Sequence, residues 1–161
     1  MKNPLVFVVD DNKITVKLLK RTLESNGYDV QEAYDGIDCL EKVAQRPPDA
    51  IVLDVMMPRL DGYGTVQRIK ASEETAGIPV VIVTALNDVA NQLKAIEMGA
   101  DDFLSKPVEN KLLIAKVKML SAISIEHKKA VALESAIKQM ADGQIDPKAV
   151  TVDSLYADAG L

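Results

Sequence analysis

The sequence predicts an α/β fold in which a doubly wound parallel sheet of five strands carries helices on both faces. Across residues 4–122, five short apolar runs alternate with stretches that have helical spacing. Strict alternation is typical of parallel sheets, because each parallel connection needs a crossover that a helix usually supplies. The three central runs are apolar without interruption, as expected for strands buried on both faces.

The five strand predictions rest on apolar runs bounded by Asp, Asn, Pro or Gly, residues that are frequent in turns. Three runs are strong, at residues 5–9, 50–53 and 79–83. Two weaker runs lie at residues 28–33 and 102–104. Together they give one sheet of short strands.

The helix predictions rest on apolar residues three or four positions apart between the strands. Such stretches lie at residues 14–23, 39–43, 66–70 and 89–96, and a fifth begins near Asn110. The first four stop before a Gly or a Pro. These residues end helices because Gly adopts the left-handed conformation and Pro lacks an N–H group.

Length and charge limit what the protein does. The 161 residues suffice for one domain with a modest appendage, and 48% of them are apolar, as in folded proteins in water. The net charge is −5 and no long Lys/Arg run exists. The electrostatic attraction that drives nucleic-acid binding is therefore missing over most of the surface, and direct binding of nucleic acid is not expected.

The sequence gives no sign of export or of a membrane anchor. Five apolar residues, Leu5–Val9, follow the start, which is too few for a signal peptide or a membrane span. Cys39 is the one cysteine, so an internal disulfide is excluded and a cysteine metal cluster is not expected. We therefore expect a cytoplasmic protein without a membrane partner.

Polar residues stand at or just after the ends of four of the predicted strands. They are three carboxylates, one hydroxyl and one ammonium group: Asp10, Asp11, Asp54, Thr84 and Lys106. In open parallel sheets, binding sites form in the crevice at the carboxyl ends of the strands. We therefore expect these side chains to converge in one site.

The chemistry of this group favours a phosphoryl site with a magnesium ion. Three nearby carboxylates repel one another, and a divalent cation that prefers hard oxygen ligands relieves the repulsion. Mg²⁺ is expected, because it accepts a few carboxylates and completes its shell with water and phosphate oxygens. Lys106 and Thr84 remain to bind a further anion, and one Asp would be the nucleophile that accepts the phosphoryl group.

Four motifs resemble the receiver (CheY-like) domain of two-component response regulators. They are "VVDDN" at residues 8–12, "LDVMMPRLDG" at 53–62, "VTA" at 83–85 and "GADDFLSKP" at 99–107. The resemblance spans residues 4–122, and it is specific because the motifs follow four separate strands in the family's order. It implies a five-stranded sheet in the flavodoxin-like order 2-1-3-4-5.

The resemblance also implies the chemical roles. Asp54 would be the phosphoacceptor. Mg²⁺ would bind Asp10, Asp11, Asp54 and the backbone carbonyl of Met56. The phosphoryl group would come from a phosphohistidine on a sensor histidine kinase or a histidine phosphotransfer protein. The domain would not be an enzyme, but it would assist its own phosphorylation and dephosphorylation.

Further expectations concern the phosphoryl oxygens and the loops around them. By the same resemblance, Thr84 and Lys106 would contact the phosphoryl oxygens, and the Lys106–Pro107 peptide bond would be cis. Pro58 and the glycines Gly62 and Gly64 predict that the loop after Asp54 passes close to the site and tolerates a positive φ.

The family's signal leaves the site through a threonine and an aromatic residue, here Thr84 and Phe103. Phe103 has no hydroxyl, so the switch would be steric and apolar; the alternative is that Phe103 is a core aromatic.

Two positions that flank the path of the hydrolytic water in relatives are apolar here, Met56 and Leu86. They predict slow loss of the phosphoryl group.

Residues 123–161 form a predicted extension to a receiver domain at residues 1–122. The stretch 109–140 contains no Pro or Gly, and its apolar residues Ile123, Ala130, Leu133, Ile137 and Met140 have heptad-like spacing. Two alternatives stay open: the last helix pairs with a second copy, or this stripe folds back onto the same domain. Asp146 and Pro147 predict the cap and first residue of a short helix.

The output would be contact with a downstream protein target, because no output domain fits in the extension. An alternative is that the chain is the N-terminal part of a longer regulator with an enzymatic output domain.

A phosphohydrolase of the haloacid dehalogenase type is a weaker alternative. It needs Asp-x-Asp after the first strand and an acidic pair after the lysine, whereas Asp101 and Asp102 precede Lys106. A nucleotide-binding module would need a glycine-rich phosphate loop after the first strand, where none stands.

Overall fold

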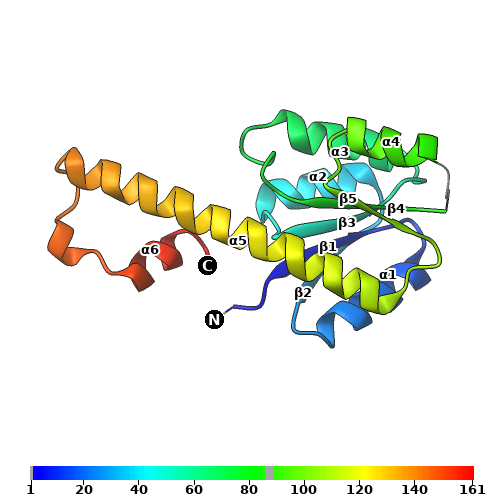
Figure 1. The fold of residues 1–161 in the computed structure, drawn as a ribbon, viewed down its shortest axis with the longest axis horizontal. Coiled ribbons are helices and arrows are strands. Elements are labelled where there is room, and N and C mark those ends of the chain that lie inside the picture. Colours follow the sequence, from blue (N-terminus) through cyan, green and yellow to red (C-terminus); the bar gives the residue numbers. More distant parts are fainter. Residues whose placement is uncertain (1, 86–88) are drawn as a thin grey trace.

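A single parallel sheet in the order β2-β1-β3-β4-β5 organises the chain. This computed structural model describes residues 2–85 and 89–161. The strands are β1 (Leu5–Val9), β2 (Asp29–Ala33), β3 (Ala50–Asp54), β4 (Val80–Thr84) and β5 (Asp102–Ser105). Figure 1 shows them side by side in the body of the molecule. The predicted fold class and strand order are confirmed.

Two apolar cores lie on the two faces of the sheet. Alternate residues of β1 point to opposite sides, so Phe7 and Val9 join one core while Val6 and Val8 join the other. All residues of β1, β3 and β4 are buried. The uninterrupted apolar runs in the sequence therefore correspond to the three inner strands, which helices cover on both sides.

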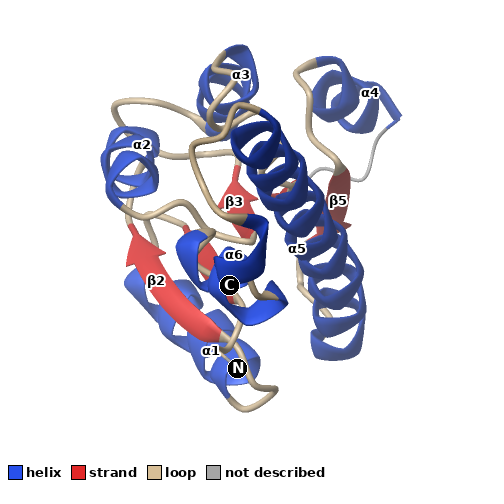
Figure 2. Ribbon diagram, turned by 90° about the vertical axis from the view of Figure 1, so that its left-hand side faces the viewer, coloured by secondary structure: helices blue, strands red, loops and turns tan. Residues whose placement is uncertain are grey.

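The helices divide between these cores (Figure 2). The helices are α1 (Lys13–Glu24), α2 (Gly36–Gln45), α3 (Gly62–Ala71), α4 (Val89–Glu97) and α5 (Asn110–Ala141). Buried residues of α2, α3 and α4 join the core that contains Phe7. Buried residues of α1 and α5 join the core that contains Val6. Helices on both faces are what right-handed crossovers on the two sides of a parallel sheet produce.

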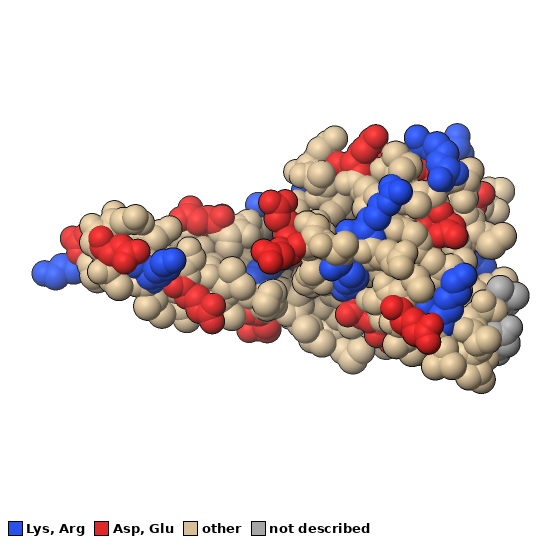
Figure 3. Space-filling model, turned by 90° about the horizontal axis from the view of Figure 1, so that it is seen from above, with Lys and Arg blue, Asp and Glu red and all other residues tan. Residues whose placement is uncertain are grey.

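The last long helix, α5, extends far beyond the sheet. It has 32 residues and starts at Asn110, as predicted, and the expected domain boundary at residue 122 falls inside it without a break. Figures 1 and 3 show its C-terminal half as a narrow arm that projects from the body of the molecule. Among the described residues, no helix, α5 included, is both long enough and apolar enough to cross a membrane.

The chain folds back after α5. Asp146 caps a turn of 3₁₀ helix at Pro147–Ala149, at the predicted position, and the helix α6 (Val152–Asp158) follows. The sequence prediction missed α6. The reciprocal capping box between Thr151 and Ser154 is the local signal that marks its start. The helix α6 then packs along α5 (Figure 1).

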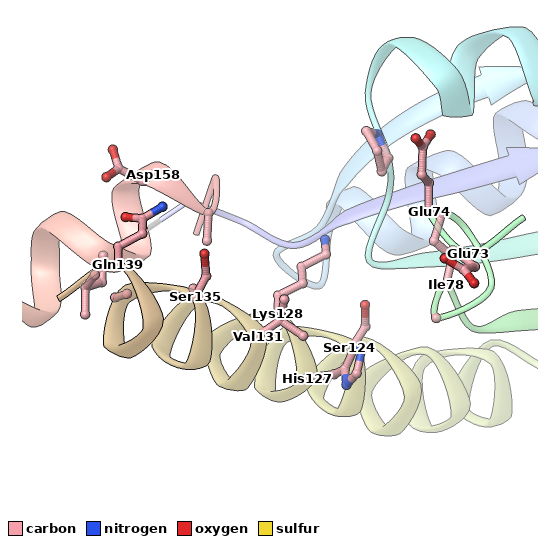
Figure 4. A pocket seen from close by; sticks show the side chains of 16 residues that line it. Glu73, Glu74, Ile78, Ser124, His127, Lys128, Val131, Ser135, Gln139 and Asp158 are labelled. Atoms are coloured by element: carbon pink, nitrogen blue, oxygen red, sulfur yellow. The ribbon is translucent and has the colours of Figure 1, made fainter. Parts of the chain in front are cut away.

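The heptad-like stripe of α5 does not fold onto the domain, so that alternative was wrong. Ile123 is 60% exposed and Ile137 is 55% exposed. The opposite side of the arm is the covered one, with Ser124 and Ala136 buried. On that side a cavity of about 570 Å³ separates α5 and α6 from the loop between α3 and β4 (Figure 4).

Candidate functional site

Three carboxylates meet at the carboxyl ends of β1 and β3. Asp10 directly follows β1, Asp54 is the last residue of β3, and the two strands are neighbours in the sheet. One carboxylate oxygen from each of Asp10, Asp11 and Asp54 lies within 4.8 Å of the other two. Asp10 and Asp54 are buried, whereas Asp11 is exposed. The predicted convergence of the three carboxylates is therefore present in the structure.

Local capping explains why Asp11 is available to this group. Asn12, rather than Asp11, caps α1, and its side chain accepts hydrogen bonds from the N–H groups of Ile14 and Thr15. Asp10 accepts a hydrogen bond of 2.9 Å from the N–H of Asn12. The turn after β1 is thus satisfied by Asn12 and Asp10, and the Asp11 side chain stays at the mouth of the site.

Lys106 brings a positive charge to the carboxylates from the end of β5, the strand at the edge of the sheet. Its Nζ lies 2.9 Å from an oxygen of Asp54 and 3.5 Å from an oxygen of Asp10. The residue directly follows β5, and its N–H donates a hydrogen bond of 2.8 Å to the carbonyl of Thr84. The peptide bond from Lys106 to Pro107 is cis, as predicted. Lys106 therefore reaches both buried carboxylates, although one strand separates β5 from β3 and two strands separate it from β1.

The charges of the site are not balanced by protein groups alone. Burial raises the pKa of Asp10; the N–H of Asn12 and the Lys106 ammonium lower it, while the charge of Asp54 raises it further. Burial lowers the pKa of Lys106, but Asp54 and Asp10 outweigh this effect and raise it. The ammonium is thus firmly charged, and one ammonium faces three carboxylates. Hard oxygen donors with surplus negative charge suit Mg²⁺.

Thr84 stands at the same edge of the sheet. It is the last residue of β4 and is buried at 3% exposure. Because β4 lies between β3 and β5, Thr84 comes from the strand between those that deliver Asp54 and Lys106. Met56, two residues beyond Asp54, has an exposed side chain. The other predicted position for hydrolysis control, Leu86, lies outside the described residues.

Phe103 is not a core aromatic in this structure. It lies on β5 and is half-buried, and it belongs to neither apolar core. The Nζ of Lys116, on α5, lies 5.7 Å from the centroid of its ring and 2.7 Å from Asp102. The aromatic ring therefore lies toward the surface of β5, beneath a cation from α5.

The loop after Asp54 is held by an ion pair that sequence reasoning missed. Arg59 has a φ of 64°, and its guanidinium binds one oxygen of Asp35 at 2.7 and 2.8 Å. The expected positive φ is thus at Arg59 and not at the glycines Gly62 and Gly64. Gly62 serves the close approach instead, because a Cβ there would collide with the backbone oxygen of Asp54. No sequence pattern pairs Arg59 with a residue 24 positions earlier.

The fold and the site together define a CheY-like α/β domain with an acidic pocket at the carboxyl edge of its sheet. Comparison of the sequence with known families agrees, since the family described as "Response regulator receiver domain" matches residues 6–118. The chain belongs to this family, which is a family of two-component signalling domains.

Individual relatives support the same assignment. The chain is 39% identical over 117 residues to "DNA-binding dual master transcriptional regulator RpaA" of Synechocystis, covering 73% of this chain and 48% of that protein. It is 36% identical over 142 residues to "Response regulator MprA" of Mycobacterium bovis, covering 88% of this chain and 60% of that protein. The chain therefore spans about half the length of these curated relatives.

A solved structure has the same fold. The receiver domain of the Francisella response regulator 1452 superimposes with a TM-score of 0.70 and 35% sequence identity. The match covers 74% of this chain and 98% of that one. The shared part is thus a receiver domain, and the remaining quarter of this chain is additional to it.

Proposed function

We propose that Asp54 accepts a phosphoryl group from a phosphohistidine and that this event controls a protein contact. The observation that carries the proposal is the 2.9 Å contact between Lys106 Nζ and the buried carboxylate of Asp54, beside Asp10 and Asp11. Because a fixed cation lies beside this buried carboxylate, it can pair with the negative charge of an incoming phosphoryl group. The phosphohistidine would be carried by a sensor histidine kinase or a histidine phosphotransfer protein.

The transfer is a displacement at phosphorus. A carboxylate oxygen of Asp54 forms the new O–P bond, the P–N bond to the donor's imidazole breaks, and the imidazole nitrogen takes the electron pair. The Lys106 ammonium then pairs with a phosphoryl oxygen, and the Thr84 hydroxyl donates to another. Mg²⁺, held by Asp10, Asp11, Asp54 and the carbonyl of Met56, would neutralise charge on the phosphoryl oxygens. In this sense the domain assists its own phosphorylation and dephosphorylation.

The signal would leave the site through Thr84 and Phe103. A phosphoryl group that attracts the Thr84 hydroxyl draws this buried side chain toward Asp54. The ring of Phe103, which now lies toward the surface under Lys116, then turns inward. Phosphorylation thus favours one of two existing arrangements rather than creating a new one. The altered surface of β5 and α5 would be the part that a downstream protein recognises.

The extension supports a protein target over nucleic acid. Residues 124–161 carry four Lys and six acidic residues, a net charge of −2. The face of the molecule in Figure 3 shows acidic and basic groups interspersed, without a broad basic patch.

We propose residues 1–122 as the receiver, residues 123–161 as its extension, and the cytoplasm as its location. A second candidate, the receiver part of a longer regulator, is favoured by the greater length of its curated relatives.

The haloacid dehalogenase alternative has less support. Its acidic pair would have to serve the site, but Asp101 binds Lys70 at 2.9 Å and Asp102 binds Lys116 at 2.7 Å. Both carboxylates are thereby committed to ion pairs with α3 and α5. Turnover of p-nitrophenyl phosphate by the purified chain would revive this alternative.

Intact-mass measurement tests the proposed function. The chain is incubated with acetyl phosphate and Mg²⁺, and we expect a gain equal to one phosphoryl group. Asp54→Ala should show no gain, whereas Asp61→Ala, which removes a carboxylate that caps α3, should behave like the native chain. A modification that persists in Asp54→Ala would contradict the assignment.

A further inference from the structure

An apolar stripe runs along the outer side of α5. We define this outer stripe as the apolar residues at two positions of a seven-residue repeat: Leu112, Met119, Ile123, Ala130, Leu133, Ile137 and Met140. Leu112, Met119, Ile123, Leu133 and Ile137 are 44–60% exposed. Because α5 is one continuous helix, the repeat forms one face, which Lys116, paired with Asp102 of the domain, interrupts between Leu112 and Met119. An exposed apolar face of this length is typical of a surface that another molecule covers.

The spacing of the outer stripe is that of a coiled coil. From Met119 to Met140 its positions advance by four and three residues in alternation, with Glu126 at one of them. In heptad terms, Ile123 and Ile137 are at a positions and Leu133 is at a d position. A β-branched residue at a with Leu at d favours two parallel strands.

We propose that α5 pairs through the outer stripe with α5 of a second copy of this chain, as a parallel coiled coil in register. The inference concerns assembly and does not depend on phosphorylation of Asp54. The second copy is preferred to an unrelated helix because both charge and steric features of α5 suit self-pairing.

The two sides of the arm are compatible with this pairing. The covered side, with Ser124, Lys128, Ala132 and Ala136, faces the domain and α6. At 100° per residue, the centre of that side lies about 160° around the helix from the centre of the outer stripe. The cavity in Figure 4 also lies on the covered side. A second copy can therefore bind the outer stripe while α6 keeps its position.

Charges beside the stripe select the parallel arrangement. Lys129 is at a g position and Glu134 is at the e position of the next heptad. A parallel in-register pair brings Lys129 of each copy to Glu134 of the other, twice by symmetry. An antiparallel pair brings g to g and e to e, and forms neither contact. Glu134 is exposed and has no ion pair within the described ranges, so it is available. The ammonium of Lys129 lies 5.5 Å from the centroid of the ring of Tyr156 on α6 and must turn from it to reach Glu134 of the other copy.

Glu126 is the one charged residue among the core positions from 119 to 140. Two copies of Glu126 would face each other and weaken the coil. Lys129 of the same chain lies 3.0 Å from Glu126 and offsets part of the repulsion. The coil should therefore be weak and reversible, and Glu126→Leu should tighten the dimer at least about tenfold in Kd.

Sedimentation of the full chain over a range of concentrations tests the dimer. We expect a reversible dimer, with Leu133→Asp at least about tenfold weaker. Lys138→Asp introduces the same side chain at an exposed position beside the stripe and should leave the dimer intact. Far-UV circular dichroism checks that α5 stays helical in each variant. A native chain that is monomeric throughout, or a dimer insensitive to Leu133→Asp, would overturn the proposal.

Cross-linking and charge exchange test the parallel register. Under oxidation, Leu133→Cys should form a disulfide with its own copy, and Lys138→Cys should not. Cys39 can remain, because burial raises the pKa of its thiol to about 12 and keeps it unreactive. Glu134→Lys should weaken the dimer, and adding Lys129→Glu should restore part of the loss. A dimer that fails to cross-link through residue 133 would overturn the parallel register.

Discussion

The Nζ of Lys128, on the arm of α5, lies 2.6 Å from one carboxylate oxygen of Asp49, the residue just before β3. The other oxygen of Asp49 accepts a hydrogen bond of 2.8 Å from the N–H of Leu5, the first residue of β1. One carboxylate thereby joins the base of two central strands to the extension. Figure 4 shows Lys128 directed toward this part of the sheet. The arm is thus tied to the end of the sheet opposite the acidic site.

Loss of the Lys128–Asp49 ion pair should increase the mobility of the arm and lower the unfolding free energy of the domain only slightly. Lys128→Met removes the ion pair but keeps the aliphatic part of the side chain, and we expect a loss of about 1 kcal/mol in unfolding free energy. Hydrogen exchange should rise in residues 128–141 and α6. Lys138→Met, an exposed lysine on the same helix without a contact to Asp49, is the control. Equal exchange in both variants would argue against a special role for Lys128.

Magnesium should stabilise the fold through the three carboxylates. At a concentration about a hundred times its Kd, a single bound ion adds about 2.7 kcal/mol to the unfolding free energy. Asp11→Asn is the informative variant, because Asp11 is exposed and its loss should weaken ion binding without disturbing the core. Thermal melts with and without Mg²⁺ measure the effect. Equal shifts in the native chain and in Asp11→Asn would exclude Asp11 as a ligand.

The Arg59–Asp35 pair should stabilise the fold at neutral pH and lose this effect in acid. Burial raises the pKa of Asp35, but the hydrogen bonds from the N–H of Asp38 and from Arg59, together with the Arg59 charge, outweigh it and lower the pKa below its usual value. The stabilisation is therefore fully present above the unfolded pKa and is lost as the pH falls through the lower folded pKa.

Asp35→Asn tests this dependence. The variant should be less stable than the native chain at neutral pH, and the difference should shrink as the solution is acidified below about pH 4. Arg59→Ala should cost about 1 kcal/mol at neutral pH and show the same trend. Urea unfolding at a series of pH values measures both. A difference that stays constant with pH would show that the charge of Asp35 is not the cause.

The parts of the structure that the sequence predicted are those with local signals. Each inner strand is an apolar run in the sequence. Asp54 was predictable because it stands at the end of such a run, where sites form in parallel sheets. The ion pairs of Arg59 with Asp35 and of Lys128 with Asp49 join residues 24 and 79 positions apart. Such contacts depend on which loops the tertiary fold brings together, so no periodicity reveals them. The direction of the α5 stripe was also open, because a helix pattern shows which residues share a face but not what lies against it.

Removal of Lys106 should slow phosphorylation without removing the acceptor. Lys106→Met keeps the length of the side chain but leaves the charge of the incoming phosphoryl group without a fixed cation. We expect the rate with acetyl phosphate to fall at least tenfold, equivalent to about 1.4 kcal/mol in the barrier. Lys111→Met, an exposed residue on α5, is the control. An unchanged rate in Lys106→Met would remove Lys106 from the proposed mechanism.

The phosphorylated form should be long-lived if Met56 and Leu86 flank the path of the hydrolytic water as the same positions do in relatives, because both side chains are apolar. Met56 has an exposed side chain that cannot orient a water molecule, and Leu86 has the same limitation by its chemistry. Met56→Asn and Leu86→Glu each supply a polar group, and each should speed loss of the phosphoryl group about tenfold. Intact-mass measurement after removal of the donor follows the decay. Met56→Leu should decay like the native chain, since it changes shape but not polarity. A native lifetime of seconds, or variants that decay at the native rate, would show that these two positions do not control hydrolysis.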